Sequence, residues 1–269
     1  MTRSPNPFRP LSGHQSAAAA GLTGLALCTA LAATPALAQE AEIPRGESRW
    51  GIGLGADVRQ QPYRGVDNAS TGIPLVYFEN HWVRVMGPSA ELKLPSAGPF
   101  AFRLKARYSD EGYKPSDSAA LAGMAEREDG IWLGGEVIWQ TPYLNLSAEL
   151  MGDASSHSEG RQFRLQADRR FDFGAFSVTP RLAAIRLDRE YVGYYHGVGA
   201  AEATAGRPAY GGEAATNVEA GLRVDYRLDA KQTVFLDLRS TRLGSAIADS
   251  PLVDRSRVSG VRVGYFYRF

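Results

Sequence analysis

One short segment of the sequence carries side chains that could do catalytic chemistry. Asp153, Ser155, Ser156, His157 and Glu159 lie within a single run of the chain. A histidine beside a carboxylate can act as a general base and activate water or a serine hydroxyl. The same residue types are also common in polar turns, and closeness in sequence does not create a catalytic geometry. We therefore interpret this segment as a solvated loop, and a surface enzyme is the least favoured function.

The sequence predicts no cofactor and no metal either. His81 and His196 stand alone, without the spacing of metal ligands. Gly51, Gly53 and Gly55 resemble a phosphate-binding loop, but they alternate along a strand and no helix follows them. Glycines at such positions leave room on one face of a strand. No residue is therefore assigned as catalytic, cofactor-binding or metal-binding.

A larger set of charged residues could act together inside a pore. They recur at alternate positions of strand-like segments: Arg103, Lys105, Arg107, Glu136, Arg164, Asp168, Arg223, Asp225, Arg227, Asp237 and Arg239. A row of such charges can select solutes, or it can pair across strands and fill the interior. The two signs nearly balance, which favours pairing and a filled or narrowly conducting interior. A narrow channel for small polar solutes remains the alternative function.

Strands must position these charges, because apolar residues recur with a period of two. The pattern is clearest around residues 50–58, 100–108, 131–139, 163–171, 218–228 and 261–269. A soluble sandwich also has one apolar and one polar face. Three features favour a transmembrane barrel: strands long enough to cross a tilted bilayer, aromatic residues at strand ends, and charges at mid-strand. No apolar run after residue 38 is long enough for a spanning helix.

The links between these strands alternate in length. Short links fall at residues 80–81, 96–99, 141–142, 172–174 and 228–231, and long links at 60–70, 110–129, 152–160, 188–215 and 244–255. Bacterial barrels have short periplasmic turns and long outer loops. Both termini then lie in the periplasm only if Gly87 and Pro88 form one further outer turn between short strands at 82–86 and 89–94. The prediction is an antiparallel barrel of about twelve strands, or ten if that region is a plug or bulge.

The first 38 residues have the pattern of a secretory signal peptide. Arg3 and Arg9 precede an apolar stretch, and Ala36 and Ala38 before Gln39 fit a cleavage site. The sequence thus divides into a signal peptide at 1–38 and a barrel domain at 39–269. Cys28 is the single cysteine and lies in the leader, so the mature chain contains no disulfide.

The charge of the mature chain excludes one class of partner. Arg3 and Arg9 are the only charged residues of the leader, which leaves 28 basic and 29 acidic residues. Binding a phosphate backbone needs a basic excess, so no nucleic-acid partner is expected.

The last eight residues carry a polar-x-Gly-x-x-aromatic-x-aromatic pattern through Arg262, Gly264, Tyr267 and Phe269. This pattern resembles the terminal signature of bacterial outer-membrane barrels, which the barrel-assembly machinery reads. The resemblance predicts a chain in contact with outer-membrane lipid, located in the outer membrane of a Gram-negative bacterium.

Several segments resemble the MipA/OmpV family in the expected order. They are Gln61-Pro62-Tyr63-Arg64-Gly65-Val66-Asp67, Ile73-Pro74-Leu75-Val76-Tyr77, Tyr191-x-x-Tyr194-Tyr195-His196-Gly197-Val198, Ala201-Glu202-Ala203, Pro208-Ala209-Tyr210, Thr241-Arg242-Leu243-Gly244 and Asp249-Ser250-Pro251-Leu252-Val253. Together they span almost the whole mature chain. His196 departs from the pattern, where a third aromatic residue is expected.

The resemblance implies a non-enzymatic scaffold in the outer membrane. In that family the scaffold links a lytic transglycosylase to a penicillin-binding synthase during peptidoglycan remodelling. Other members resemble adhesins or stress-responsive membrane proteins.

Overall fold

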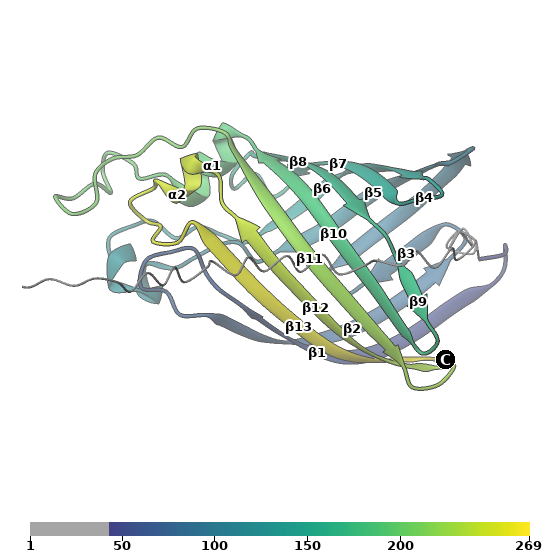
Figure 1. Ribbon diagram of the computed structural model, residues 1–269. Coiled ribbons are helices and arrows are strands. Elements are labelled where there is room, and N and C mark those ends of the chain that lie inside the picture. The colour runs from purple at the N-terminus through teal and green to yellow at the C-terminus, as the bar shows by residue number, and fades with distance from the viewer. Residues whose placement is uncertain (1–42) are drawn as a thin grey trace, which may run out of the picture. The chain divides into compact units, whose positions relative to one another are not determined.

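The protein is a β-barrel in a computed structural model that describes residues 43–269 (Figure 1). The predicted leader and its cleavage residues Ala36, Ala38 and Gln39 lie outside the described residues. The strands are β1 (Ser48–Arg59), β2 (Ala69–Asn80), β3 (Val83–Met86), β4 (Ser89–Ala97), β5 (Phe100–Ser109), β6 (Gly130–Gln140), β7 (Asn145–Asp153), β8 (Arg161–Asp168), β9 (Phe171–Phe173), β10 (Phe176–Leu187), β11 (Ala215–Arg227), β12 (Gln232–Arg242) and β13 (Arg257–Arg268). Two helices, α1 (Arg189–His196) and α2 (Ser245–Ala248), lie in outer loops, as do two short 3₁₀ turns, η1 (Pro115–Asp117) and η2 (Ala119–Leu121). No helix within residues 43–269 has the length and apolarity needed to cross a membrane.

The sheet closes on itself because the last strand pairs with the first. β13 runs antiparallel to β1 from Gly51 opposite Arg268 to Arg59 opposite Gly260. β8 and β9 both pair with β10, so they form one barrel strand with a break at Arg169 and Arg170. All pairings are antiparallel, and the barrel has twelve strands. The predicted strand number and the predicted outer turn at Gly87 and Pro88 are confirmed.

Prolines within strands mark the discontinuities of the ladder, because proline has no N–H to donate. Pro180 lies in β10 opposite the break between β8 and β9, where its carbonyl accepts a hydrogen bond from Arg169 N–H at 3.3 Å. Pro95 lies in β4 at the register shift between Leu94 and Ala97. Pro74 lies in β2 beyond the point where β3 ends, since β3 pairs only with Tyr77–Glu79.

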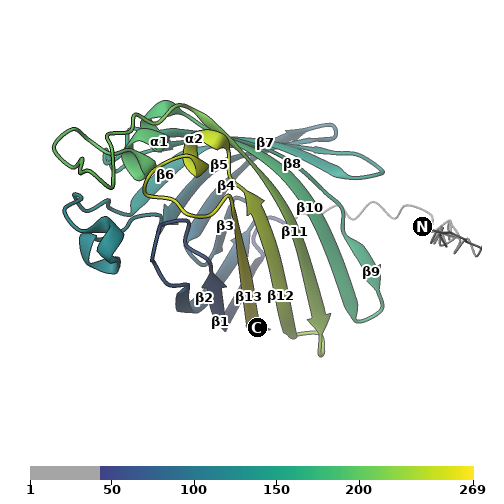
Figure 2. The same cartoon turned by 60° about the vertical axis from the view of Figure 1, so that its left-hand side comes forward.

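The two ends of the barrel differ, as the alternation of loop lengths predicts. The C-terminus and the short turns lie at one end, and the long loops with α1 and α2 lie at the other (Figures 1 and 2). The apolar faces of the strands point outward, and Leu54, with 73% of its surface exposed, is the clearest example. Trp50, Trp82 and Trp139 are exposed near the short turns, where an aromatic belt meets the membrane interface. The polar faces point into the lumen.

Candidate functional site: a capped and ion-paired lumen

The segment that could have been catalytic is a loop held by backbone hydrogen bonds. The Asp153 carboxylate accepts bonds from Ser155 N–H at 2.8 Å, Ser158 N–H at 2.6 Å and Glu159 N–H at 3.1 Å. Ser156 and Glu159 both have positive φ, which places them in a tight turn. Asp153 therefore shapes the loop and does not orient a histidine.

His157 points toward a different loop. Its Nδ1 lies 2.8 Å from the Asp129 carbonyl oxygen, and its Nε2 lies 3.1 Å from a Glu128 carboxylate oxygen. Neither nitrogen is bonded to Ser155 or Ser156. The structure thus joins two outer loops through His157 and assembles no nucleophile–base pair there. Within residues 43–269 no cluster of histidine, cysteine and carboxylate side chains has the arrangement of a metal site.

The charged residues of the polar strand faces pair between nearby strands along the lumen wall. Lys105 on β5 lies among three glutamates: it hydrogen-bonds Glu149, its Nζ is 3.1 Å from Glu136, and it is 4.0 Å from Glu91. Glu91 in turn accepts a 2.7 Å bond from Arg103. On the opposite wall Arg181 binds Asp237 with two bonds of 2.7 and 2.8 Å, and Arg164 binds Glu219 at 2.6 Å.

A third group of charges spans the junction of the first and last strands. Asp57 on β1 is buried and accepts a 2.9 Å bond from Arg262 on β13 and a 3.3 Å bond from Arg239 on β12. Nearer the short turns, Lys93 pairs with Glu79. Buried ion pairs add little net stability, but losing one partner costs about 3–5 kcal/mol because a charge is left uncompensated. The pairing interpretation of the lumen charges is therefore the one that the geometry supports.

The glycines of β1 do not leave an empty lumen. A Cβ at Gly51 would overlap the ring of Phe266, and one at Gly53 would overlap the backbone of β13. The space that these glycines provide is occupied by Phe266, whose ring also contacts Tyr77 edge-on with centroids 5.5 Å apart. This end of the lumen is filled by aromatic side chains and by the Lys93–Glu79 pair.

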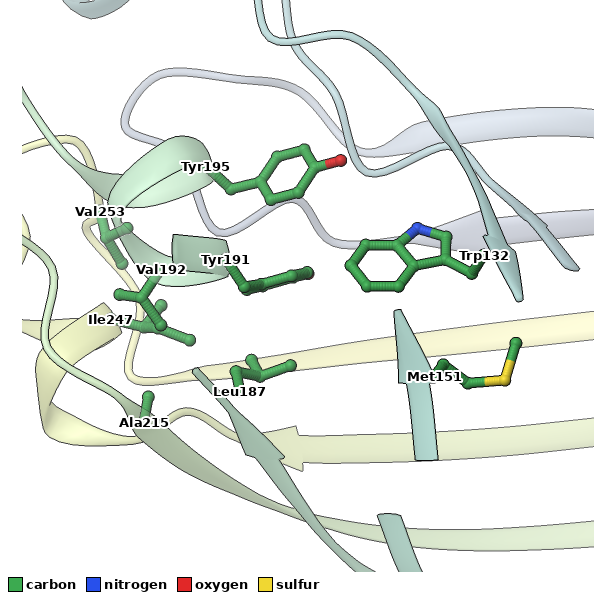
Figure 3. Packing of buried hydrophobic residues seen from close by; sticks show 9 residues of the cluster. All are labelled: Trp132, Met151, Leu187, Tyr191, Val192, Tyr195, Ala215, Ile247 and Val253. Carbon is green, nitrogen blue, oxygen red and sulfur yellow. The ribbon is translucent and has the colours of Figure 1, made fainter. Parts of the chain in front are cut away.

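The outer mouth is covered by a cap, which we define as α1, α2 and the loops at residues 60–68, 110–129 and 197–214. Figure 3 shows Tyr191 and Tyr195 pointing from α1 toward Trp132 of β6, within a cluster that also contains Val192 and Ile247. A second cluster joins the other loops: Tyr63, Tyr113, Leu121, Met124, Val198 and Leu252. The Asp188 side chain begins α1 by accepting a 2.9 Å bond from Tyr191 N–H.

Polar contacts fix the cap loops to one another. Arg127 binds Glu202 at 3.0 Å and donates to the Tyr194 carbonyl at 2.6 Å. Arg207 donates to the Ala120 carbonyl at 2.7 Å and the Glu202 carbonyl at 2.8 Å. Burial opposes ionisation of Glu202, but backbone N–H donors and Arg127 outweigh it and hold the pKa of Glu202 below its usual value.

Burial in the cap shifts two further groups. It raises the pKa of Tyr113 to about 12 and lowers the pKa of His196 to about 4. His196 stacks on Tyr63 with ring centroids 5.5 Å apart, and Ser250 Oγ donates to the His196 carbonyl at 2.6 Å. The histidine thus occupies an aromatic site in its neutral form, which explains how it replaces the third aromatic residue expected there.

A cavity of about 710 Å³ lies between the cap and the ion-paired lumen. Tyr191 and His196 line it from the cap, and Arg107, Arg164 and Glu219 line it from the barrel wall. This is the volume of a typical small-molecule site. Three of its lining residues, Glu91, Glu149 and Glu219, were not singled out from the sequence, nor were the ion-paired lumen residues Asp57 and Arg181; their places on polar strand faces were the available signal.

The C-terminal signature has a structural counterpart. Arg262 points into the lumen toward Asp57, and Gly264 lies against the ring of Phe235, where a Cβ would be 2.6 Å from ring carbons. Tyr267 and Phe269 contact each other at the end with the short turns, and Phe269 N–H donates to the Trp50 carbonyl at 3.0 Å. Recognition of this strand by the assembly machinery stays a prediction.

The closed sheet, the apolar exterior and the aromatic belt define a twelve-stranded transmembrane β-barrel with a capped, ion-paired lumen. The family model for MltA-interacting protein MipA matches residues 52–269, so the chain belongs to that family.

Named relatives agree with this class, and one solved structure is reported beside them. MltA-interacting protein of Escherichia coli (strain K12) is 25% identical over 238 residues, which cover 87% of this chain and 95% of the relative. The putative outer membrane protein YiaT of the same strain is 24% identical over 82% of this chain and 92% of its own. The NanC porin structure is 10% identical with a TM-score of 0.42, over 80% of this chain and 98% of that one. The protein is located in the outer membrane of a Gram-negative bacterium.

Proposed function

We propose that this barrel is a scaffold that links a lytic transglycosylase to a penicillin-binding synthase during peptidoglycan remodelling. The observation that carries the proposal is the nearly full-length similarity to a protein named for interaction with MltA. The capped mouth and the mutual pairing of the lumen charges support a scaffold over a narrow solute channel, because charges that neutralise one another are not free to bind a solute.

We place the docking surface on the short turns, since a murein-cleaving partner works in the periplasm. Tyr143, with 75% of its surface exposed, lies in the turn between β6 and β7. Thr141 Oγ1 accepts bonds from Tyr143 N–H at 3.2 Å and Leu144 N–H at 3.0 Å, so the turn holds the ring outward. Exposed tyrosines on rigid supports are common anchors of protein interfaces.

Binding of a purified lytic transglycosylase to the detergent-solubilised mature barrel tests the proposal. We expect Tyr143→Ser to weaken binding at least tenfold, the loss typical of one interface anchor. Lys114→Ser, an exposed position on an outer loop, is the matched control and leaves affinity unchanged. No binding by the unmodified protein contradicts the scaffold, and equal affinity of the Tyr143→Ser variant contradicts the docking surface.

A further inference from the structure

The wall of the barrel has a gap beside β2. β3 is four residues long and pairs only with Tyr77–Glu79, and the turn after it ends with Gly87 N–H donating to the Val76 carbonyl at 3.0 Å. Because strand residues alternate in the direction of their backbone groups, Ser70, Gly72 and Pro74 face the same side as Val76. Within residues 43–269 no strand pairs with them on that side.

The gap lies at membrane level. On the other side of β2, Pro74 is opposite Leu54 and Ser70 is opposite Val58, and both β1 side chains face lipid. An open sheet edge is not tolerated in contact with hydrocarbon, but it is tolerated where the backbone lines a water-filled cavity. The free edge of β2 therefore indicates water or polar groups behind it.

The sequence of β2 suits a free edge. Pro74 has no N–H. The free edge therefore has one unpaired hydrogen-bond donor fewer at this position, where no acceptor is present. Gly72 faces lipid, and a Cβ there would meet no atom within 4 Å, so a larger side chain at this position has room beside the gap. The opposite rim is the Gly87–Pro88 turn, and neither rim carries a charged side chain.

The cavity beneath the cap reaches this gap. It is lined by lumen-facing Met86, Ser89 and Arg107 and also by Pro88 and Tyr108, which lie opposite each other on the lipid-facing side. Because Pro88 belongs to the turn and Tyr108 N–H donates to its carbonyl at 3.0 Å, the cavity extends to the rim of the gap. Met86 agrees with this geometry: its side chain points into the barrel, yet 41% of its surface is exposed.

The polarity of the side chains changes from the rim of the gap to the cavity behind it. Small uncharged residues form the rim, and charged residues line the cavity behind it. Arg107 is the charged residue beside the rim, since it pairs in register with Ser89. Its Nη2 donates to Gln162 at 3.1 Å and its Nη1 lies 3.9 Å from Glu149, while its buried Nε has no hydrogen-bond partner within the described chain.

We propose that the gap is a lateral opening through which the cavity takes a single-chain amphiphile with a phosphate-bearing head group from the outer leaflet. The head group binds beside Arg107, and the acyl chain passes between β2 and the Gly87–Pro88 turn into the bilayer. The cavity of about 710 Å³ accommodates one such head group. This binding function is separate from the proposed scaffold role.

Native mass spectrometry of the full mature barrel in maltoside micelles tests the opening, with myristoyl lysophosphatidylglycerol as the probe. We expect one probe molecule to bind the unmodified protein. Gly72→Trp places an indole over the opening and reduces the bound fraction at least tenfold. Gly152→Trp is the matched control, because Gly152 also faces lipid with open space around it but has paired strands on both sides. Arg107→Gln weakens binding of the probe.

Each variant is first checked for folding by heat-modifiable migration. Absence of binding to the unmodified barrel overturns the proposal. Equal binding by the Gly72→Trp variant excludes entry through the gap, and equal losses in the two tryptophan variants reveal general adsorption to the barrel surface. Unchanged binding by the Arg107→Gln variant removes the head-group site.

Discussion

Acidification is expected to loosen the cap through His196. This side chain is buried with a pKa of about 4, against an ordinary value of 6.5, and its Nδ1 has no hydrogen-bond partner within residues 43–269. The rings of Tyr63 and Tyr191 face it, and the nearby carboxylate of Glu111 is bonded to the Tyr191 hydroxyl at 2.6 Å. Protonation therefore places an uncompensated charge among aromatic rings.

The direction and the size of the pH effect on cap closure follow from the difference between the two pKa values of His196. An open cap takes up a proton near pH 6.5, whereas the closed cap takes it up only near pH 4, so closure is fully stable above 6.5 and weakens as pH falls through that window. The full loss is about 3 kcal/mol, and at pH 5 it is about 2 kcal/mol. Glu202 has a pKa below its ordinary value of 4.5, so its contribution is lost only as pH falls below about 4.5, which is below the pH 5 used in the assay.

Hydrogen-exchange protection factors of residues 189–197 at pH 7 and pH 5 provide the assay. A loss of about 2 kcal/mol corresponds to a roughly 30-fold decrease in protection. The His196→Phe variant keeps the ring stack on Tyr63 and removes the titrating group, so its protection should not change over this range. Equal changes in the two proteins, or no change in either, would refute the reasoning.

Four further outcomes are expected. Leu222→Arg on the lipid face of β11 should destabilise the barrel by about 2–4 kcal/mol in denaturant titrations, while Leu222→Phe should cost far less; equal costs would contradict the assigned exterior. Planar-bilayer recordings should find little conductance, because the cap covers the outer mouth and aromatic side chains occupy the other end of the lumen, and a large open current would contradict a closed lumen. N-terminal sequencing of the membrane-extracted protein should begin at Gln39; a start at Met1 would contradict the predicted leader. Deleting Phe269 removes an exposed ring and one terminal ladder bond, a loss of order 1–3 kcal/mol, yet it should deplete the protein from the outer membrane far more than Phe173→Ala does; equal levels would exclude an assembly signal.

The barrel itself could be predicted from the sequence because its signals are local. A period of two defines each wall strand, and the lengths of the links define which end each turn occupies. The parity of the strands then required an outer turn at Gly87–Pro88, and the structure has it. The interruptions were not predicted, although Pro74, Pro95 and Pro180, which each lie where a ladder is broken or unpaired, were available signals for them.

The cap could not be predicted in the same way. α1 has eight residues, and its buried Tyr191 packs against Trp132, which lies on a strand far away in sequence. A helix this short is stabilised by tertiary packing, not by its own periodicity. The ion-pair partners of the lumen charges could not be predicted for a related reason. Strand alternation places Arg239 inside, but only the tilt and register of the closed sheet bring it to Asp57.

The C-terminal strand combines these local and distant signals. Its aromatic residues occupy the interface at the short turns, while its polar residue, Arg262, lies directly opposite Asp57 in the pairing of β13 with β1. Arg239 on β12 approaches the same carboxylate, so one buried aspartate is shared by arginines from the last two strands. A barrel in which β13 paired with β1 in a register shifted by one residue would move Arg262 to the lipid face and remove its bond to Asp57. The Arg262–Asp57 pair therefore disfavours an incorrect register between β13 and β1, where the first and last strands meet. It also gives Arg262, the polar position of the signature, a physical role within the folded barrel.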